Sequence, residues 1–146
     1  MNKLKREILF RGKREKNNEW TYGFLVRAEN VITEEKETFI IDSEATYYGY
    51  GEFDIVTKVL PETVGQHTGL TDKNGIGIYE GDIVKTCYTC GENAVLAVKF
   101  SSVRGGWFPY ACGDGCGCCE EDTYLPEYTE VIGNIYDKPE LLGETK

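Results

Sequence analysis

Apolar and polar residues alternate along much of the chain, and this period of two predicts a protein built mainly from β-strands. The runs EILFRGK and WTYGFLV, joined by the polar segment KNNE, predict a β-hairpin, and VIT and TFIID around EEKE predict a second one. DIVTKVL predicts a short strand that ends at Pro61, because proline has no N–H to donate to a strand ladder. YYGYGEF, punctuated by glycines, predicts either a loop or a bulged strand.

Turn residues divide the second half of the chain into short segments. DKNG (72–75) supplies asparagine and glycine where a turn needs positive φ, and Asp82 can hold the turn at Glu80-Gly81-Asp82 through its side chain. Strands are expected at VLAVKF, WFPYA and TEVIGNIY, and one or two helical turns at DKPELLG with Asp137 as N-cap. A short helix within residues 61–70 is disfavoured by its glycines. The residues expected to shape these turns are Gly69, Gly75, Tyr79, Gly81 and Asp82.

Length and composition fit one domain, or one domain with a small appendage, at 146 residues and 40% apolar content. No run of eighteen apolar residues predicts a membrane span, and the apolar core ILF is too short for a signal peptide. The expected location is therefore a reducing cytoplasm, where stable disulfides are uncommon.

Charge is spread unevenly along the chain. Residues 1–16 hold seven Lys/Arg against two Glu, whereas residues 17–60 hold three basic and nine acidic side chains and residues 61–146 hold six and fourteen. Proteins that bind nucleic acid normally present a clustered positive face. General nucleic-acid binding is therefore disfavoured, and the N-terminal arm is the one segment that could support it, through Lys3, Lys5, Arg6, Arg11, Lys13 and Arg14.

Four blocks of the sequence resemble the YopX family of phage and prophage proteins. They are FRGK (10–13), WTYG (20–23), PETVGQHTGLTDKNGIGIYEGDIV (61–84) and EVIGNIYDKPELL (130–142), in the family's order. His67 departs from the family pattern, which usually has an aromatic residue there, and the cysteine-rich segment is not part of that pattern.

This resemblance implies a mainly β protein with an SH3-like small barrel toward the C-terminus and self-association. It also implies carriage by temperate phages or mobile elements in a bacterial host, and it implies no chemistry. Combined with the strand pattern, it predicts an N-terminal β-hairpin subdomain over residues 1–60 and a barrel with a cysteine-rich insertion over residues 61–146.

Catalytic chemistry has little support in the sequence, and the protein is expected not to be an enzyme. His67 is the single histidine, and no serine or cysteine lies in a nucleophile elbow beside which it could act as base. The acidic groups Glu80/Asp82 and Glu120-Glu121-Asp122 match no known metal-binding loop, and turn stabilisation or solvation accounts for them.

The cysteines are the candidate metal ligands. Cys87 and Cys90 form a C-x-x-C-G turn typical of a zinc knuckle, and Cys116 and Cys119 supply a second C-x-x-C within CGDGCGCC. These four thiolates would hold a structural zinc ion, with Cys112 and Cys118 as spares. Disulfides and an accidental surface insertion are the alternatives, and an iron–sulfur cluster is a weaker one.

Two functions from different classes follow from these observations. The first is a non-enzymatic, self-associating interaction module that also binds an unknown host or phage protein. The second is a nucleic-acid-associated regulator that uses the basic arm. For the first, the candidate contact residues are the aromatic cluster Tyr47, Tyr48, Tyr50 and Phe53, which could otherwise be packing between subdomains.

Overall fold

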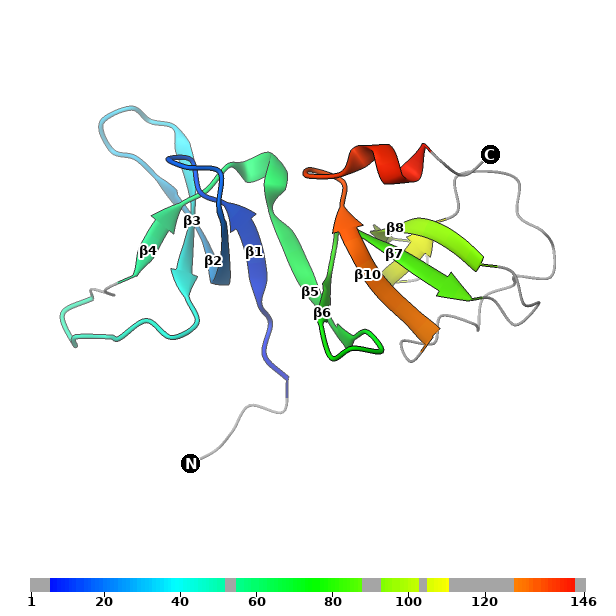
Figure 1. Cartoon of the computed structure of the whole chain (residues 1–146). Coiled ribbons are helices and arrows are strands. Elements are labelled where there is room, and N and C mark those ends of the chain that lie inside the picture. Colours follow the sequence, from blue (N-terminus) through cyan, green and yellow to red (C-terminus); the bar gives the residue numbers. More distant parts are fainter. Residues whose placement is uncertain (1–5, 52–54, 88–92, 103–104, 111–127, 144–146) are drawn as a thin grey trace. The chain divides into compact units, whose positions relative to one another are not determined.

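A computed structural model describes residues 6–51, 55–87, 93–102, 105–110 and 128–143. The chain divides into two compact units, residues 1–67 and 68–146. The described residues form ten strands and two short 3-10 helices, which confirms the prediction of a mainly β protein (Figure 1). None of the described helices is long and apolar enough to cross a membrane. The strands form two sheets, of order β4-β3-β2-β1-β5-β6 and β10-β7-β8-β9.

Unit 1 is a small antiparallel sheet of β1 (Phe10–Lys13), β2 (Trp20–Glu29), β3 (Lys36–Asp42) and β4 (Val56–Lys58), followed by η1 (Pro61–Thr63). β5 (Gly65–Thr71) crosses the boundary between the units, and its first residues pair with β1. An isolated bridge between Arg14 and Val59 joins the end of β1 to the segment after β4. The Thr63 hydroxyl accepts a hydrogen bond from the backbone N–H of Lys13, which fixes η1 on β1.

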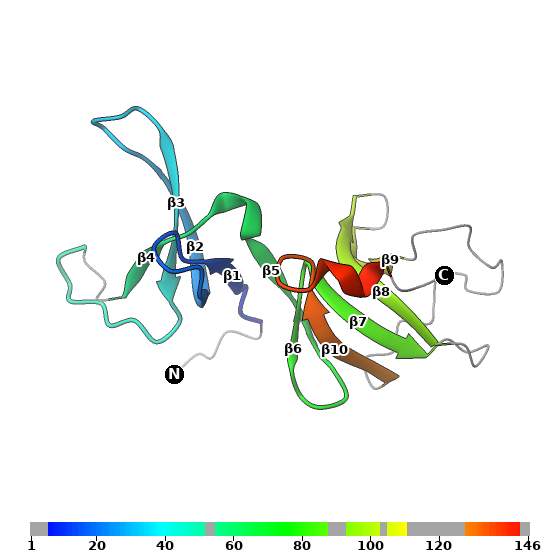
Figure 2. The same ribbon diagram turned by 45° about the horizontal axis from the view of Figure 1, so that its top comes forward.

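The expected second hairpin is wrong in one detail. VIT (31–33) is a turn, and the strand that pairs with β3 is the long β2. The reason is Asn30, whose side-chain oxygen accepts hydrogen bonds from the backbone N–H groups of Ile32 and Thr33 and so bends the chain. Val31 is consequently 91% exposed. YYGYGEF belongs to the segment between β3 and β4, and its described residues form a loop that projects from the sheet in both views (Figures 1 and 2).

Unit 2 contains β6 (Gly77–Tyr79), β7 (Asp82–Cys87), β8 (Asn93–Ser101), β9 (Gly106–Tyr110), β10 (Thr129–Asn134) and η3 (Pro139–Leu142). Its core is a cluster of buried branched side chains: Ile78, Val84, Leu96 and Val98. Strands β10, β7, β8 and β9 form an open four-stranded sheet, and a closed barrel, as the resemblance implied, is not found among the described strands. The SH3-like topology stays a prediction.

The turn residues behave largely as the sequence predicted. Asp82 accepts a hydrogen bond from the backbone N–H of Tyr79 at 2.8 Å and closes the turn before β7. Gly81, at φ +86°, donates to Val98 and accepts from Ile135, so it joins two strands at a point where a side chain would crowd the Tyr136 ring. Gly69 and Gly75 also have positive φ.

The expected N-cap at Asp137 is wrong. Lys138 occupies the N-cap position of η3, without a side-chain cap bond. Asn134 caps the preceding turn instead, because its side-chain oxygen accepts hydrogen bonds from the N–H groups of Tyr136 and Asp137.

Candidate interaction surface

Strand β2 places its larger apolar side chains outward. Along this strand Thr21 and Gly23 are buried, whereas Tyr22, Phe24 and Val26 are 44%, 42% and 38% exposed. A half-buried antiparallel strand normally turns its apolar residues toward the core and its polar ones toward water. In β2 this arrangement is reversed, so its aromatic side chains remain partly exposed to solvent.

The neighbouring strands extend this apolar surface. Residues opposite each other in an antiparallel ladder lie on the same face of the sheet. Phe24 pairs with Ile41 and Val26 with Phe39, and Ile41 pairs in turn with Val56 of β4. We call this set the outer face; its members are Tyr22, Phe24, Val26, Phe39, Ile41 and Val56.

The inner face explains why the large residues point outward. An added Cβ at Gly12 would lie 3.1 Å from the Val59 Cβ and 3.3 Å from Ile40 Cδ1, and one at Gly23 would collide with the carbonyl oxygen of Ile41. At Gly12 the neighbouring side chains would have to move, and at Gly23 the added atom would meet the backbone of β3. These glycines of FRGK and WTYG therefore have little or no room for a side chain.

On β1 the same side of the sheet carries two buried cations. Arg11 and Lys13 lie opposite Tyr22 and Trp20, and their charged ends lie 4.6 Å and 5.4 Å from the centroid of the Trp20 ring. Both side chains are buried, with Arg11 6% exposed. Strand pairing and the position beside the Trp20 ring therefore fix these two side chains in the sheet.

Three of the four predicted contact residues lie on the projecting loop. Tyr47, Tyr48 and Tyr50 are exposed, the last at 89%, and Phe53 lies outside the described residues. A hydrogen bond from the Asp42 N–H to the Ile55 carbonyl oxygen closes the base of the loop. The base of the loop therefore lies directly beside Ile41 and Val56 of the outer face. The sequence pointed to the loop but missed the face. The missed signal is the small residues alternating with aromatic ones in WTYGF.

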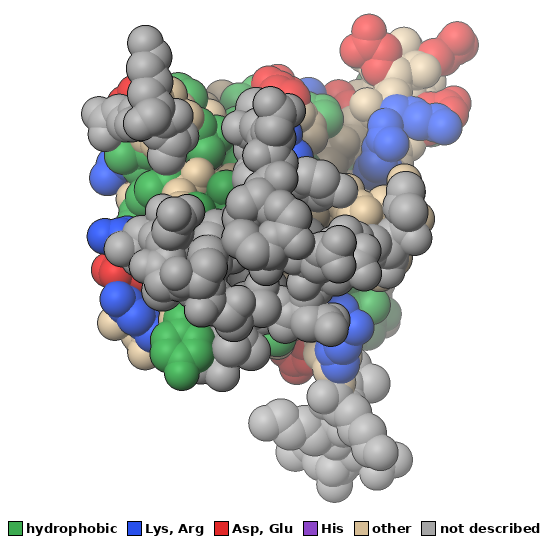
Figure 3. Space-filling model, turned by 90° about the vertical axis from the view of Figure 1, so that its right-hand side faces the viewer, with side chains coloured by type: hydrophobic (Ala, Val, Ile, Leu, Met, Phe, Trp, Pro, Cys, Tyr) green, Lys and Arg blue, Asp and Glu red, His purple; other side chains and the backbone are tan. Residues whose placement is uncertain are grey.

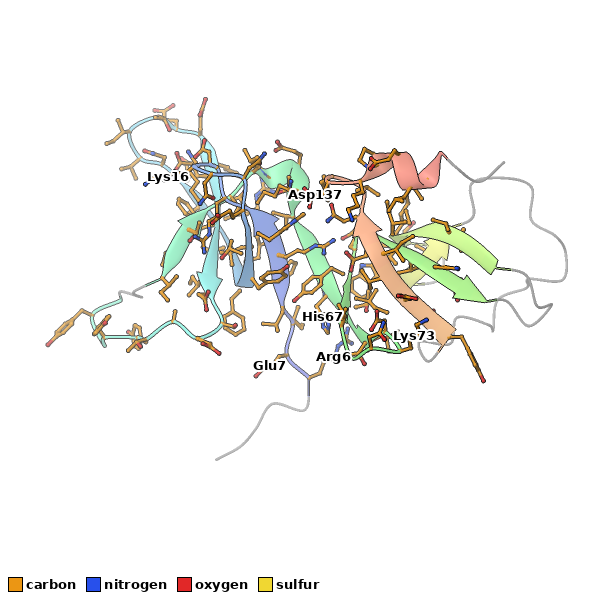
Figure 4. The ribbon with its side chains drawn as sticks, viewed as in Figure 1. Arg6, Glu7, Lys16, His67, Lys73 and Asp137 are labelled. Atoms are coloured by element: carbon orange, nitrogen blue, oxygen red, sulfur yellow. The ribbon has the colours of Figure 1, made fainter. Side chains whose placement is uncertain are left out.

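His67 is half-buried in β5, where its backbone N–H donates to the Leu9 carbonyl oxygen at 2.7 Å. Burial, followed by the charge of Arg6, lowers the pKa of this imidazole, and Arg6 lies near it in Figure 4. His67 therefore lies on a strand, with the charge of Arg6 acting on it.

The predicted zinc site cannot be assembled from the described residues. Cys87 ends β7, and its partners Cys90, Cys116 and Cys119 lie outside the described ranges, as do Cys112, Cys118 and the acidic residues 120–122. Among the residues that are described, three or more potential ligands do not gather anywhere. The zinc ion stays a prediction.

Charge is mixed on the described surface. On the face of the molecule in Figure 3, Lys/Arg and Asp/Glu side chains are interspersed, with hydrophobic side chains between them. Ion pairs between described residues join distant parts of the chain, such as Lys73 with Glu130 at 2.7 Å.

Comparison with known proteins gives a family and a fold. The family model described as YopX protein matches residues 9–143. A similar solved structure is the crystal structure of protein EF1440 from Enterococcus faecalis, with a TM-score of 0.54 and 23% identity over 93% of this chain and 98% of that chain. This likeness shows the fold alone. Among curated proteins, no significant match was found.

Proposed function

The chain belongs to the YopX family, and we propose that it is a non-enzymatic, self-associating protein-interaction module that docks through the outer face of unit 1. The observation that carries this proposal is the arrangement of side chains along β2. Its aromatic side chains face water, whereas its small residues are buried. The close packing at Gly12 accounts for large side chains pointing outward, but it does not require those side chains to be apolar.

The size of the exposed surface supports a second copy as the occupant. An aromatic side chain contributes about 150–250 Å² when fully covered. Scaled by their exposed fractions, the outer face and the three loop tyrosines together offer roughly 700 Å². This exceeds the largest patch of a typical monomer and approaches the area of about 800 Å² that each partner contributes to a standard interface.

The test changes the outer face and leaves the fold alone. Phe24→Asp with Val26→Asp introduces charge at exposed positions, so circular dichroism should stay unchanged while self-association is lost. Val31→Asp with Ile32→Asp is the matched control, because it makes the same chemical change at exposed residues of the β2–β3 turn. We expect light scattering to show an oligomer for the wild type and the control, and a monomer for the outer-face variant.

Two results would contradict the proposal. One is a wild-type monomer at about 50 µM, a concentration at which an interface of standard size should be occupied. The other is an outer-face variant that associates as well as the control. In either case the exposed aromatic residues would need a different explanation.

The alternative, a nucleic-acid-associated regulator, has less support. Burial of Arg11 and Lys13 removes two of the six cations on which it depends. A filter-binding assay with duplex DNA at physiological salt checks it, and we expect weak binding that vanishes as salt is raised.

A further inference from the structure

The loop between β3 and β4 is both acidic and aromatic. No Lys or Arg occurs between Lys36 and Lys58, and among the described residues of this loop Asp42 and Glu44 stand beside the exposed tyrosines. Neither carboxylate forms an ion pair with a described residue; Asp42 instead accepts a hydrogen bond from the Glu44 N–H at 2.9 Å. The loop therefore offers negative charge and open aromatic rings together.

Such a combination suits a segment rich in Lys and Arg. Aromatic ring faces attract ammonium and guanidinium groups, and adjacent carboxylates add Coulomb attraction. Tyrosine also supplies large, rigid contacts at low entropic cost, as in antibody paratopes. Unit 1 uses the same chemistry internally, where Arg11 and Lys13 stack on Trp20.

The chain itself contains a matching segment. Residues 1–16 carry seven Lys/Arg against two Glu, and the segment that precedes β1 holds Lys3, Lys5 and Arg6. Arg6 is exposed. The rest of the sequence has a net negative charge, so this arm is the strongest complement to the loop within the chain.

Strand register places the start of β1, which follows the arm in the sequence, and the start of the loop at the same end of the sheet. Phe10, the first residue of β1, pairs with Gly23, and Gly23 pairs with Asp42, where the loop begins. Two copies related by a two-fold axis near this end could therefore exchange arms reciprocally, as an isologous interface requires.

Resting on the proposed function, we infer that the basic arm of one copy docks on the acidic tyrosine loop of a second copy, beside the paired outer faces. Among the described residues, Tyr50 is 89% exposed, and Arg6 forms no ion pair with Asp42 or Glu44. The outer face supplies apolar area, and the arm–loop contact supplies orientation and salt dependence.

A charge-swap experiment with the full chain tests this inference. The arm variant is Lys3→Glu/Lys5→Glu/Arg6→Glu, and the loop variant is Ser43→Lys/Glu44→Lys, whose positions are exposed. Each alone should weaken self-association roughly tenfold at low salt, and an equimolar mixture of the two should associate as heterodimers. At about 1 M salt, where the Debye length falls to about 3 Å, the differences should largely disappear.

The control is Glu29→Lys/Glu35→Lys, which reverses charge at exposed positions near the other hairpin. An equal loss of association in this control would show that net charge, not arm docking, is responsible. A mixture that associates no better than either variant would show that the arm binds its own loop or another site. If Phe24→Asp/Val26→Asp abolishes association while both charge variants associate normally, the inference about the arm fails and the proposed function stands.

Discussion

The two units use their apolar residues in opposite ways. In unit 2 the branched side chains of Ile78, Val84, Leu96 and Val98 pack against one another and are buried. In unit 1 the buried apolar side chains among the described residues are Ile40 and Val59, set beside residues as small as Gly12, while aromatic side chains of the same sheet face outward. The two units therefore differ in which apolar side chains they bury and which they expose.

Polar groups in the two interiors differ as well. Unit 2 buries Asp72, whose carboxylate accepts from three backbone N–H groups: Asn74 and Ile76 bind Oδ1, and Val131 binds Oδ2, at 2.8–2.9 Å. Unit 1 buries the hydroxyls of Thr21 and Thr38, which find no partner among the described residues. In unit 2 the Trp107 Nε1 group is likewise buried without a partner among the described residues, so each interior carries polar groups whose burial costs free energy. The outward aromatic residues of unit 1 are consistent with a unit completed by association.

The largest difference between the units should appear when one large apolar side chain is truncated in each of them. Ile78→Ala removes a side chain with no exposed surface and should lower the free energy of unfolding of unit 2 by about 3 kcal/mol. Phe24→Ala should cost unit 1 less than about 1 kcal/mol in the dissociated protein, because the ring is already 42% exposed.

The two tryptophans allow each unit to be followed separately, since Trp20 lies in unit 1 and Trp107 in unit 2. Urea unfolding by fluorescence in a Trp20→Phe background reports unit 2, and in a Trp107→Phe background it reports unit 1. A loss of about 3 kcal/mol from Phe24→Ala would show that the outer face is part of the folding core, against our interpretation.

The next largest effect should come from Asp72→Asn. The amide keeps the size of the side chain but removes its charge and one acceptor, so at least one of the three N–H groups is left poorly paired. We expect a loss of about 2 kcal/mol from unit 2 and none from unit 1. Glu130→Gln is the matched control, because it weakens an exposed ion pair with Lys73 and should cost less than about 0.5 kcal/mol.

Local patterns in the sequence predicted most of this fold. Glycines and aspartates placed the turns at residues 72–75 and 80–82, because those turns depend on positive φ and on short side-chain bonds within the segment. The turn at VIT was missed because Asn30 competes with the strand through side-chain bonds that apolar patterning does not include.

The outer face could not be predicted from alternation alone. A period of two identifies two faces of a strand but not which one is buried, and the aromatic side of WTYGF was the natural choice for the core. The deciding facts are long-range: an added Cβ at Gly12 would press on the side chains of Val59 and Ile40, and one at Gly23 would collide with the backbone of Ile41.

The smallest expected effect is a difference in acid sensitivity between the units. Burial by itself raises the pKa of Asp72, but the N–H groups of Val131, Ile76 and Asn74 outweigh it and lower that pKa below its ordinary value of 3.8. A carboxylate with a lowered folded-state pKa stabilises the protein fully above its unfolded pKa, and this contribution is lost as pH falls through the folded value. Unit 2 should therefore lose stability below about pH 4, where the unfolded chain takes up the proton first.

In unit 1 the carboxylate with a lowered pKa is Glu37, bonded to Lys58 at the surface, where solvent screens the interaction. Unfolding of the two single-tryptophan proteins between about pH 2.5 and 7 measures this difference. The gap between wild type and Asp72→Asn should narrow as pH falls. A gap that stays constant would show that the Asp72 carboxylate charge does not contribute to the stability of unit 2.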